Sequence, residues 1–237
     1  MSTRKPFRFK QFSVNDSKCA MKVGTDAVLL GAWADVRAAE TILDIGTGCG
    51  LIALMAAQRS KAHITAIDID EDATLQSKEN FSFSPWSERI EAIHIAVQQF
   101  QPDRLYDRII CNPPFFKNGL KTPVYKRNLA RHNDTLSFES LVFEVNRLLT
   151  ENGKFIFILP VEEAFEVIHI ASSRQLYVNR FCNVYSREDK LPNRILAELS
   201  RNESVGSIEL FTIRDLNNQY TAEYKELTKD FYLFLTE

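Results

Sequence analysis

The chain has 237 residues, which is enough for one large α/β domain with a full hydrophobic core. Its formal net charge of −2 gives no overall attraction to nucleic acid, so any such partner must be recognised by local patches. The apolar runs are far shorter than the roughly 20 residues that cross a bilayer. No apolar segment with a cleavage site follows the basic N-terminus, so a secretory signal is not expected. We therefore predict a cytoplasmic protein without a membrane span.

Four cysteines are scattered along the chain, at Cys19, Cys49, Cys111 and Cys182. They form no C-x-x-C pair and have no matching histidine spacing, which argues against a zinc site and against a disulfide framework. We expect reduced, mostly buried thiols and no bound metal.

The first 34 residues predict a small cover that precedes the main domain. Residues 7–23 resemble a polar-aromatic hairpin that turns near Asn15 and Asp16. Thr25 or Asp26 is then expected to cap a helix over residues 27–34. We place the main domain at residues 35–237 and expect the cover and this domain to form one structural unit.

From Thr41 onward, short β-rich apolar runs alternate with helical patterns, which predicts an α/β fold. We expect a mostly parallel, seven-stranded sheet with helices on both faces. The predicted strands are 41–45, 63–68, 90–95, 108–111, 154–159, 176–185 and 194–200. The predicted helices are 51–59, 71–81, 138–149 and 162–173, and Asn152 with Gly153 should stop the third of them. Residues 208–213 could add one further strand, and 221–235 a terminal helix.

A glycine-rich loop follows the first predicted buried strand. Residues 44–50 read Asp-Ile-Gly-Thr-Gly-Cys-Gly and lead into a helix, with glycines at Gly46, Gly48 and Gly50. Glycine lets the backbone turn sharply and approach a ligand closely. The spacing is neither the G-x-G-x-x-G dinucleotide fingerprint nor a phosphate-binding loop ending in G-K-[ST]. A phosphate ligand is therefore disfavoured here.

Two acidic residues bracket this loop. Asp44 precedes the glycines, where a carboxylate can offset the ammonium group of an amino-acid ligand. Asp68 ends the second strand, at about the distance where a doubly wound fold places a ribose-binding acid. Together with the glycine turn, they predict a site for a nucleoside that carries an amino acid.

The segment resembles motif I of class I S-adenosylmethionine-dependent methyltransferases, which have a Rossmann-like fold. The resemblance implies S-adenosylmethionine as cofactor, with Asp68 accepting hydrogen bonds from its ribose hydroxyls. Many relatives have an acidic residue just after the third strand, near the adenine. Here the sequence is Ile95-Ala96-Val97-Gln98, so backbone groups or Gln98 are the remaining candidates for that contact.

A second motif, Asn112-Pro113-Pro114-Phe115, ends the fourth predicted strand, beside the switch point where open α/β sheets bind ligands. A conjugated amino group is planar and weakly nucleophilic, so a site that methylates it must accept its two hydrogens. The Asn112 side-chain oxygen and the Pro113 carbonyl can do so, while Phe115 can stack on the planar acceptor. The segment resembles the N-P-P-[FY] motif of methyltransferases that act on adenine-N6, guanine-N2 or glutamine-N5.

Two stretches are locally basic. Residues 117–132 contain five cations and no acidic residue directly after the acceptor motif, and the N-terminal segment interleaves cations with phenylalanines. Such stretches suit a phosphate backbone, although each alone is more often a solvated surface. The candidates to bind a nucleic-acid backbone are Arg8, Lys10, Lys22, Lys117, Lys121, Lys126, Arg127, Arg131, Lys190 and Arg194.

From residue 9 to about residue 199, the chain resembles the bacterial tRNA (adenine-N6)-methyltransferases that modify the adenosine next to the anticodon of a valine tRNA. That resemblance implies methylation of this adenosine, tRNA as partner, and a cover whose Thr25 and Asp26 contact the methionine end of the cofactor. We also expect a monomer. The alternatives left open are a protein glutamine-N5 and an rRNA guanine-N2 methyltransferase.

Overall fold

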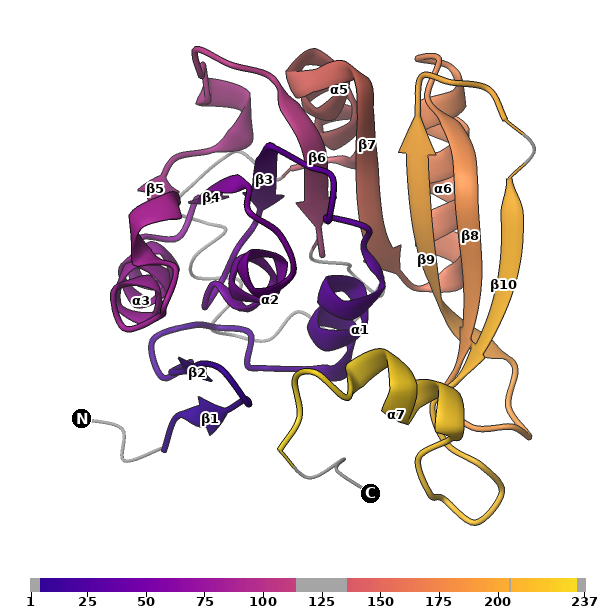
Figure 1. Cartoon of the computed structure of the whole chain (residues 1–237). Helices are drawn as coiled ribbons and strands as arrows, with labels where there is room; N and C mark the ends of the chain where they lie inside the picture. Colours follow the sequence, from indigo (N-terminus) through magenta and orange to yellow (C-terminus); the bar gives the residue numbers. More distant parts are fainter. Residues whose placement is uncertain (1–4, 114–135, 205, 234–237) are drawn as a thin grey trace.

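The computed structural model describes residues 5–113, 136–204 and 206–233 (Figure 1). Its centre is an eight-stranded sheet in the order β10–β8–β9–β7–β6–β3–β4–β5, in which β9 alone runs antiparallel to both neighbours. The strands are β3 (Thr41–Ile45), β4 (His63–Asp68), β5 (Ile90–His94), β6 (Tyr106–Cys111), β7 (Leu149–Leu159), β8 (Tyr177–Tyr185), β9 (Pro192–Ser200) and β10 (Ser207–Thr212). The predicted α/β, mostly parallel fold is confirmed.

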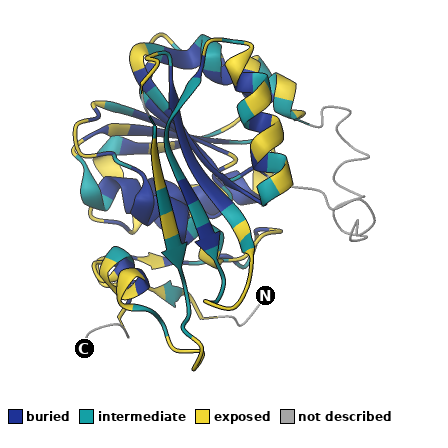
Figure 2. Ribbon diagram, turned by 90° about the vertical axis from the view of Figure 1, so that its right-hand side faces the viewer, coloured by how far each residue is buried: buried dark blue, intermediate teal, exposed yellow. Residues whose placement is uncertain are grey.

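Helices cover both faces of the sheet, as the alternation of strands and helices predicts. One face is covered by α1 (Thr25–Trp33), α2 (Leu51–Arg59), α3 (Glu71–Ser82) and α7 (Ala222–Thr228), and the other by α5 (Phe138–Leu148) and α6 (Val161–Ser172). Strand β3 shows why two cores result: Ile42 packs with the first layer, whereas Leu43 and Ile45 pack with the second. Figure 2 shows the strands buried between helices whose outer sides are exposed.

The count of seven strands is too low by one, because β10 joins the edge of the sheet. It pairs in parallel with β8 along its whole length. Its apolar residues Ile208 and Leu210 are 76% and 67% exposed, so the strand lacks the buried alternation that marks the other strands. Glu209 instead accepts hydrogen bonds from Arg180 and from the indole of Trp33, which holds β10 against α1 and β8.

The two ends of the chain differ from the prediction. The hairpin turns between β1 (Phe7–Arg8) and β2 (Ser13–Val14), rather than near Asn15 and Asp16. Those two residues make a second turn instead, in which their side chains accept the backbone N–H groups of Ser17 and Val23. At the other end, α7 stops at Thr228, and the chain turns back so that residue 232 bridges to residue 9.

The boundaries of two inner helices also differ. Helix α1 begins at Thr25 after the N-cap residue Gly24, so neither Thr25 nor Asp26 is the cap. Helix α5 ends at Leu148 because Leu149 already pairs with Tyr106 in the sheet. The register then shifts, and residues 150–153 bulge out before pairing resumes, so that Asn152 and Gly153 lie inside β7.

Every helix in the described part of the chain is too short or too polar to span a bilayer. All four cysteines are free and buried, as expected.

One buried amide fixes the N-terminal segment to the rest of the molecule. The side chain of Asn80, on α3, is 5% exposed and forms two hydrogen bonds with the backbone of Asn15, at 2.8 and 3.0 Å. Its Nδ2 also donates to the carbonyl of Cys49, in the glycine loop, at 2.8 Å. Asn80 therefore joins the N-terminal segment, α3 and the glycine loop.

We predict that Asn80→Ala lowers the free energy of unfolding by about 2–4 kcal/mol, because it leaves several buried backbone groups without partners. Urea denaturation measures this loss. The matched control is Ser82→Ala on the same helix, where the exposed hydroxyl bonds only to the carbonyl of Glu79. Equal stability of the two variants would show that Asn80 does not anchor the segment.

Candidate active site

The glycine loop joins β3 to α2 at the carboxyl edge of the sheet. Gly46, Gly48 and Gly50 have φ angles of 72°, 56° and 81°, in the left-handed region that favours glycine. A Cβ atom on Gly50 would lie 2.4 Å from the ring of Phe81, so packing also requires glycine there. Around Gly46 and Gly48 such an atom would meet no described residue within 4 Å. Those two residues therefore border open space into which a ligand can fit.

The end of β4 holds this loop in place. The backbone N–H groups of Gly46 and Thr47 donate to the carbonyl of Ile67, and the N–H of Gly48 donates to Asp68 Oδ2 at 2.8 Å. The other oxygen of Asp68 accepts the N–H of Asp70 at 2.9 Å. Burial raises the pKa of Asp68, and these two backbone N–H groups oppose the rise. Each carboxylate oxygen keeps a lone pair that can accept a ligand hydroxyl.

Asp44 lies beneath the loop and is fully buried. Its Oδ2 accepts the hydroxyl of Thr47 at 2.6 Å, while Oδ1 has no hydrogen-bond partner among the described residues. Burial raises the pKa of Asp44 to about 7; the Thr47 hydroxyl opposes this shift and the charge of Asp68 adds to it. A cationic ligand group beside Asp44 would therefore stabilise its ionised form.

The acceptor motif lies one strand away. Cys111, the last residue of β6, pairs with Ile45 of β3, so Asn112 follows β6 at the edge where Gly46 follows β3. Asn112 Oδ1 is buried and has no hydrogen-bond partner in the described part of the chain, and Pro113 is buried next to it. The last two residues of the motif, Pro114 and Phe115, lie outside the described residues.

These features fit a nucleoside that carries an amino acid. Two buried oxygens have no partner among the described residues: Asp44 Oδ1, near the end of β3, and Asn112 Oδ1, just after the adjacent β6. Carboxylates can take an ammonium group and ribose hydroxyls. No group of three or more side chains suited to hold a metal ion occurs among the residues that the structure describes.

Sequence reasoning missed two contacts of this site, made by Thr47 and Asn80, and one exposed apolar side chain next to Asp68 in the chain. Thr47 could have been found, since a hydroxyl three residues after Asp44 sits within the same tight turn. Ile69 is an apolar side chain, 39% exposed, that directly follows Asp68. The contact of Asn80 with the loop joins residues 31 positions apart, and no local pattern indicates it.

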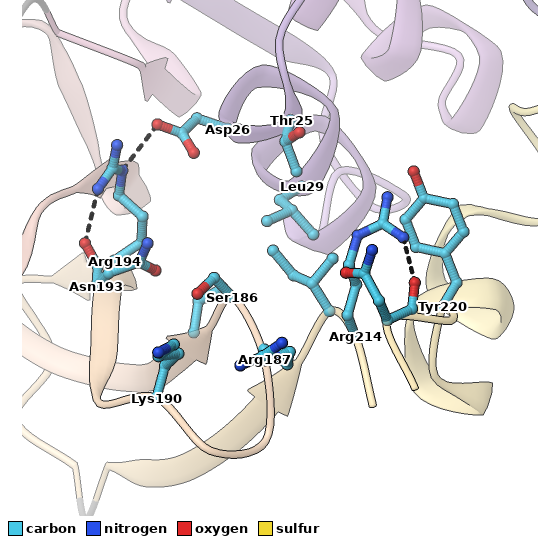
Figure 3. A pocket seen from close by; sticks show the side chains of 13 residues that line it. Thr25, Asp26, Leu29, Ser186, Arg187, Lys190, Asn193, Arg194, Arg214 and Tyr220 are labelled. Atoms are coloured by element: carbon cyan, nitrogen blue, oxygen red, sulfur yellow. Dashed lines mark hydrogen bonds and ion pairs between the residues drawn. The ribbon is translucent and has the colours of Figure 1, made fainter. Parts of the chain in front are cut away.

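The structure brings Thr25, Asp26, Lys190 and Arg194 together in one pocket at the first turn of α1 (Figure 3). There Arg194 Nε donates to Asp26 Oδ2 at 2.8 Å. The carboxylate predicted to contact the cofactor thus has a cation beside it.

The remaining tRNA-binding candidates lie elsewhere. Arg8 and Lys10 are exposed on the N-terminal hairpin. Lys22 is also on the surface, but its Nζ donates to the carbonyls of Asp16 and Cys19 and so closes its own turn. The candidates of the basic segment lie outside the described residues: Lys117, Lys121, Lys126, Arg127 and Arg131.

Residues 17–162 match the family model described as "Methyltransferase small domain". Two relatives are both named tRNA1(Val) (adenine(37)-N6)-methyltransferase. The one from Bacteroides thetaiotaomicron is 47% identical over 97% of this chain and 98% of its own, and the one from Tolumonas auensis is 43% identical over 96% of each.

Solved structures agree with the fold. A predicted O-methyltransferase from Agrobacterium tumefaciens superposes with a TM-score of 0.66 at 21% identity, covering 87% of this chain and 96% of that one. A glycopeptide N-methyltransferase complexed with S-adenosylmethionine gives a TM-score of 0.56 at 12% identity, covering 76% and 100%.

The resemblance seen in the sequence is thereby confirmed. The glycine loop, the Asn112 position and the near full-length similarity all lead to one assignment: the chain belongs to the methyltransferase small domain family and, within it, to the tRNA1(Val) (adenine(37)-N6)-methyltransferases.

Proposed function

We propose that this protein transfers a methyl group from S-adenosylmethionine to N6 of an adenosine in tRNA, the one next to the anticodon of a valine tRNA. The observation that carries the chemistry is the buried oxygen of Asn112, which has no partner among the described residues and lies one strand away from the glycine loop. The choice of acceptor rests on relatives that share more than 40% identity along nearly the whole chain.

In this proposal the cofactor lies along the glycine loop. Asp68 accepts the ribose hydroxyls with the lone pairs that Gly48 and Asp70 leave available. Asp44 offsets the ammonium group of the methionine moiety, and its own ionisation is favoured in return. Ile69 offers an apolar contact for the adenine, in addition to backbone groups or Gln98. When bound, S-adenosylmethionine supplies an activated methyl group on a sulfonium.

On the acceptor side, the motif binds the adenine amino group by hydrogen bonds and positions it for methyl transfer. Asn112 Oδ1 and the Pro113 carbonyl accept the two hydrogens of the adenine amino group. This favours a more tetrahedral nitrogen whose lone pair can attack. Pro114 stiffens the motif, and Phe115 stacks on the extruded base, as the sequence predicts. Holding nitrogen, methyl and sulfur in line requires no covalent intermediate on the protein.

Residues 1–34 are proposed to cover the cofactor site. Asn80 holds the backbone of Asn15 beside the carbonyl of Cys49, so the N-terminal segment lies directly against the glycine loop. Thr25 and Asp26 begin the helix that follows, and their contact with the methionine end of the cofactor stays a prediction, since Asp26 bonds to Arg194. We further propose that the protein acts in the cytoplasm as a monomer and without a metal ion.

The experiment that tests this function offers two acceptors. The pure protein is incubated with methyl-labelled S-adenosylmethionine and either total tRNA from a strain that lacks the enzyme or release-factor protein. We expect label in tRNA, recovered as N6-methyladenosine after nuclease digestion. Label in protein would favour the glutamine-N5 alternative, and label recovered from the RNA as N2-methylguanosine would favour a guanine-N2 enzyme; both outcomes would overturn the proposal.

Asn112→Ala should leave cofactor affinity nearly unchanged and lower turnover by about a hundredfold, because it removes one hydrogen bond that matters in the transition state. Calorimetry with S-adenosylmethionine and single-turnover methylation of tRNA separate the two effects. A large loss of cofactor affinity with normal turnover would give Asn112 a binding role instead.

Cofactor affinity should rise about tenfold between pH 6 and pH 8, because binding of an ammonium group favours ionised Asp44, whose pKa without ligand is about 7. Calorimetry across this range measures the change, and proton release on binding below pH 7 accompanies it. Asp44→Asn serves as the control, and its weaker affinity should not vary with pH. An equal pH dependence in both proteins would assign the effect to another group.

The raised pKa of Asp44 also affects the stability of the protein without cofactor, and this effect runs opposite to the one on cofactor affinity. The pKa of Asp44 is higher in the folded protein than its usual value of about 3.9, so the folded state binds more protons than the unfolded state between about pH 4 and about pH 7. Ionisation of Asp44 therefore lowers the free energy of unfolding of the cofactor-free protein as the pH rises from about 4, and the contribution of the protonated group is lost once the pH passes about 7.

A further inference from the structure

The pocket at the first turn of α1 lies at the carboxyl edge of the sheet, on the far side of β7 from the acceptor motif. Three chain segments line its volume of about 480 Å³ (Figure 3). They are the first turn of α1, the stretch from the end of β8 to the start of β9, and the segment between β10 and α7. The pocket is therefore made by tertiary folding rather than by one loop.

The lining of this pocket is strongly cationic. It contains Arg187, Lys190, Arg194 and Arg214, and Asp26 is the single carboxylate among the lining residues. Asp26 bonds to Arg194 and Asp189 bonds to Arg187, so Lys190 and Arg214 carry most of the excess positive charge.

Arg214 is held in place without an acidic partner. Its guanidinium lies 4.1 Å from the ring centre of Tyr220, and its Nη1 donates to the carbonyl of Asn218 at 2.7 Å. Within the described part of the chain, no carboxylate lies within 4.0 Å of it. Its own carbonyl accepts the N–H of Glu188, which fixes the turn between β8 and β9. A half-buried cation is thus preorganised toward an anion.

The turn between β8 and β9 supplies the other two cations. Arg187 bonds to Asp189 through Nε and Nη2, both at 2.6 Å, and no bond to Nη1 is found among the described residues. Lys190 is 58% exposed and lies 3.9 Å from the same carboxylate. Of the two acids in this turn, Glu188 and Asp189, it is Asp189 that serves both cations, and both keep N–H groups for a further acceptor.

The pocket is close to the acceptor site. Strand β7 pairs with β6 on one side and with β9 on the other. Because β9 is antiparallel, Asn193 and Arg194 at its start lie at the edge where Asn112 follows β6. Two strand spacings, roughly 10 Å, separate the near rim of the pocket from Asn112, and four spacings, roughly 20 Å, separate Arg214, which follows β10, from it. An RNA strand that places a base at Asn112 would thus pass the pocket within a few nucleotides.

We propose that this pocket binds a backbone phosphate of the RNA substrate, a few nucleotides from the base that enters the acceptor site. The proposal rests on the proposed function, since it takes RNA as the substrate. A phosphodiester accepts charge-assisted hydrogen bonds from guanidinium and ammonium groups without regard to sequence, and so positions the strand. Ser186 and Asn193, which also line the pocket, add neutral donors.

The test compares two double variants of equal charge change. Arg187→Gln with Lys190→Gln removes two pocket cations. Lys61→Gln with Arg104→Gln removes two exposed cations next to the starts of β4 and β6, at the opposite edge of the sheet. Binding of valine tRNA is measured at several salt concentrations, together with cofactor affinity, thermal unfolding and steady-state methylation.

For the pocket variant, we expect tRNA affinity to fall about tenfold and the slope of log affinity against log salt to flatten by about one unit. KM for tRNA should rise with little change in kcat, while cofactor affinity and melting temperature stay as in the wild type. The opposite-edge variant should bind like the wild type. Equal tRNA affinity and salt slope in the two variants would overturn the proposal.

Two further outcomes are distinguishable. If inorganic phosphate raises the melting temperature of the wild type but not of the pocket variant, and tRNA affinity is the same in both, the pocket binds a free anion and the proposal is wrong. If the wild type transfers no label to tRNA, the proposed function fails by itself, because tRNA binding is measured separately from methyl transfer.

Discussion

The hydrogen bonds between the glycine loop and the end of β4 are the constraint on which the site depends. The loop cannot fold back over the sheet unless Gly46, Gly48 and Gly50 take positive φ angles. Its N–H groups then find their acceptors in the carbonyl of Ile67 and the carboxylate of Asp68. The same contacts that satisfy the loop also place Asp68 where it can reach a ligand. The hydrogen bonds that fold the glycine loop therefore also position the carboxylate proposed to bind the cofactor.

The N-terminal segment contributes through an unusual combination of buried polar and aromatic contacts. Asn80 fixes its inner end near the glycine loop. Its outer end pairs with the last described residues, where the N–H of Lys10 donates to the carbonyl of Phe231 and the ring of Phe9 stacks on Tyr232. The first and last parts of the described chain therefore stabilise each other on the same side of the sheet, next to α1 and α7.

The central strands could be predicted from the sequence because each is a short β-rich run bounded by turn residues. Strands β3 and β4 and helix α2 have the predicted ends. The elements that differ are those decided by partners remote in sequence. The bulge of β7 depends on pairing with β6, the short α7 on contact with the N-terminus, and β10 on a single edge partner.

The candidate site shows the same division. Its two motifs, from Asp44 to Gly50 and around Asn112, are contiguous in sequence and were found there. Asn80 could not be predicted from the sequence, because its hydrogen bond to the carbonyl of Cys49 forms only when α3 packs beside the loop. Lys190 and Arg194 were among the candidates predicted from the sequence, whereas Arg214 lies beside them only because its carbonyl accepts the N–H of Glu188 in the folded chain.

The reversed direction of β9 has a consequence for how such a protein can change. A strand that runs against its neighbours brings its beginning, and the turn before it, to the edge where the other strands end. The turn can lengthen, shorten or alter its charge without shifting the register of β3, β4 or β6. Residues proposed to hold the cofactor and residues proposed to meet the substrate backbone are then free to diversify separately, although they share one edge of one sheet.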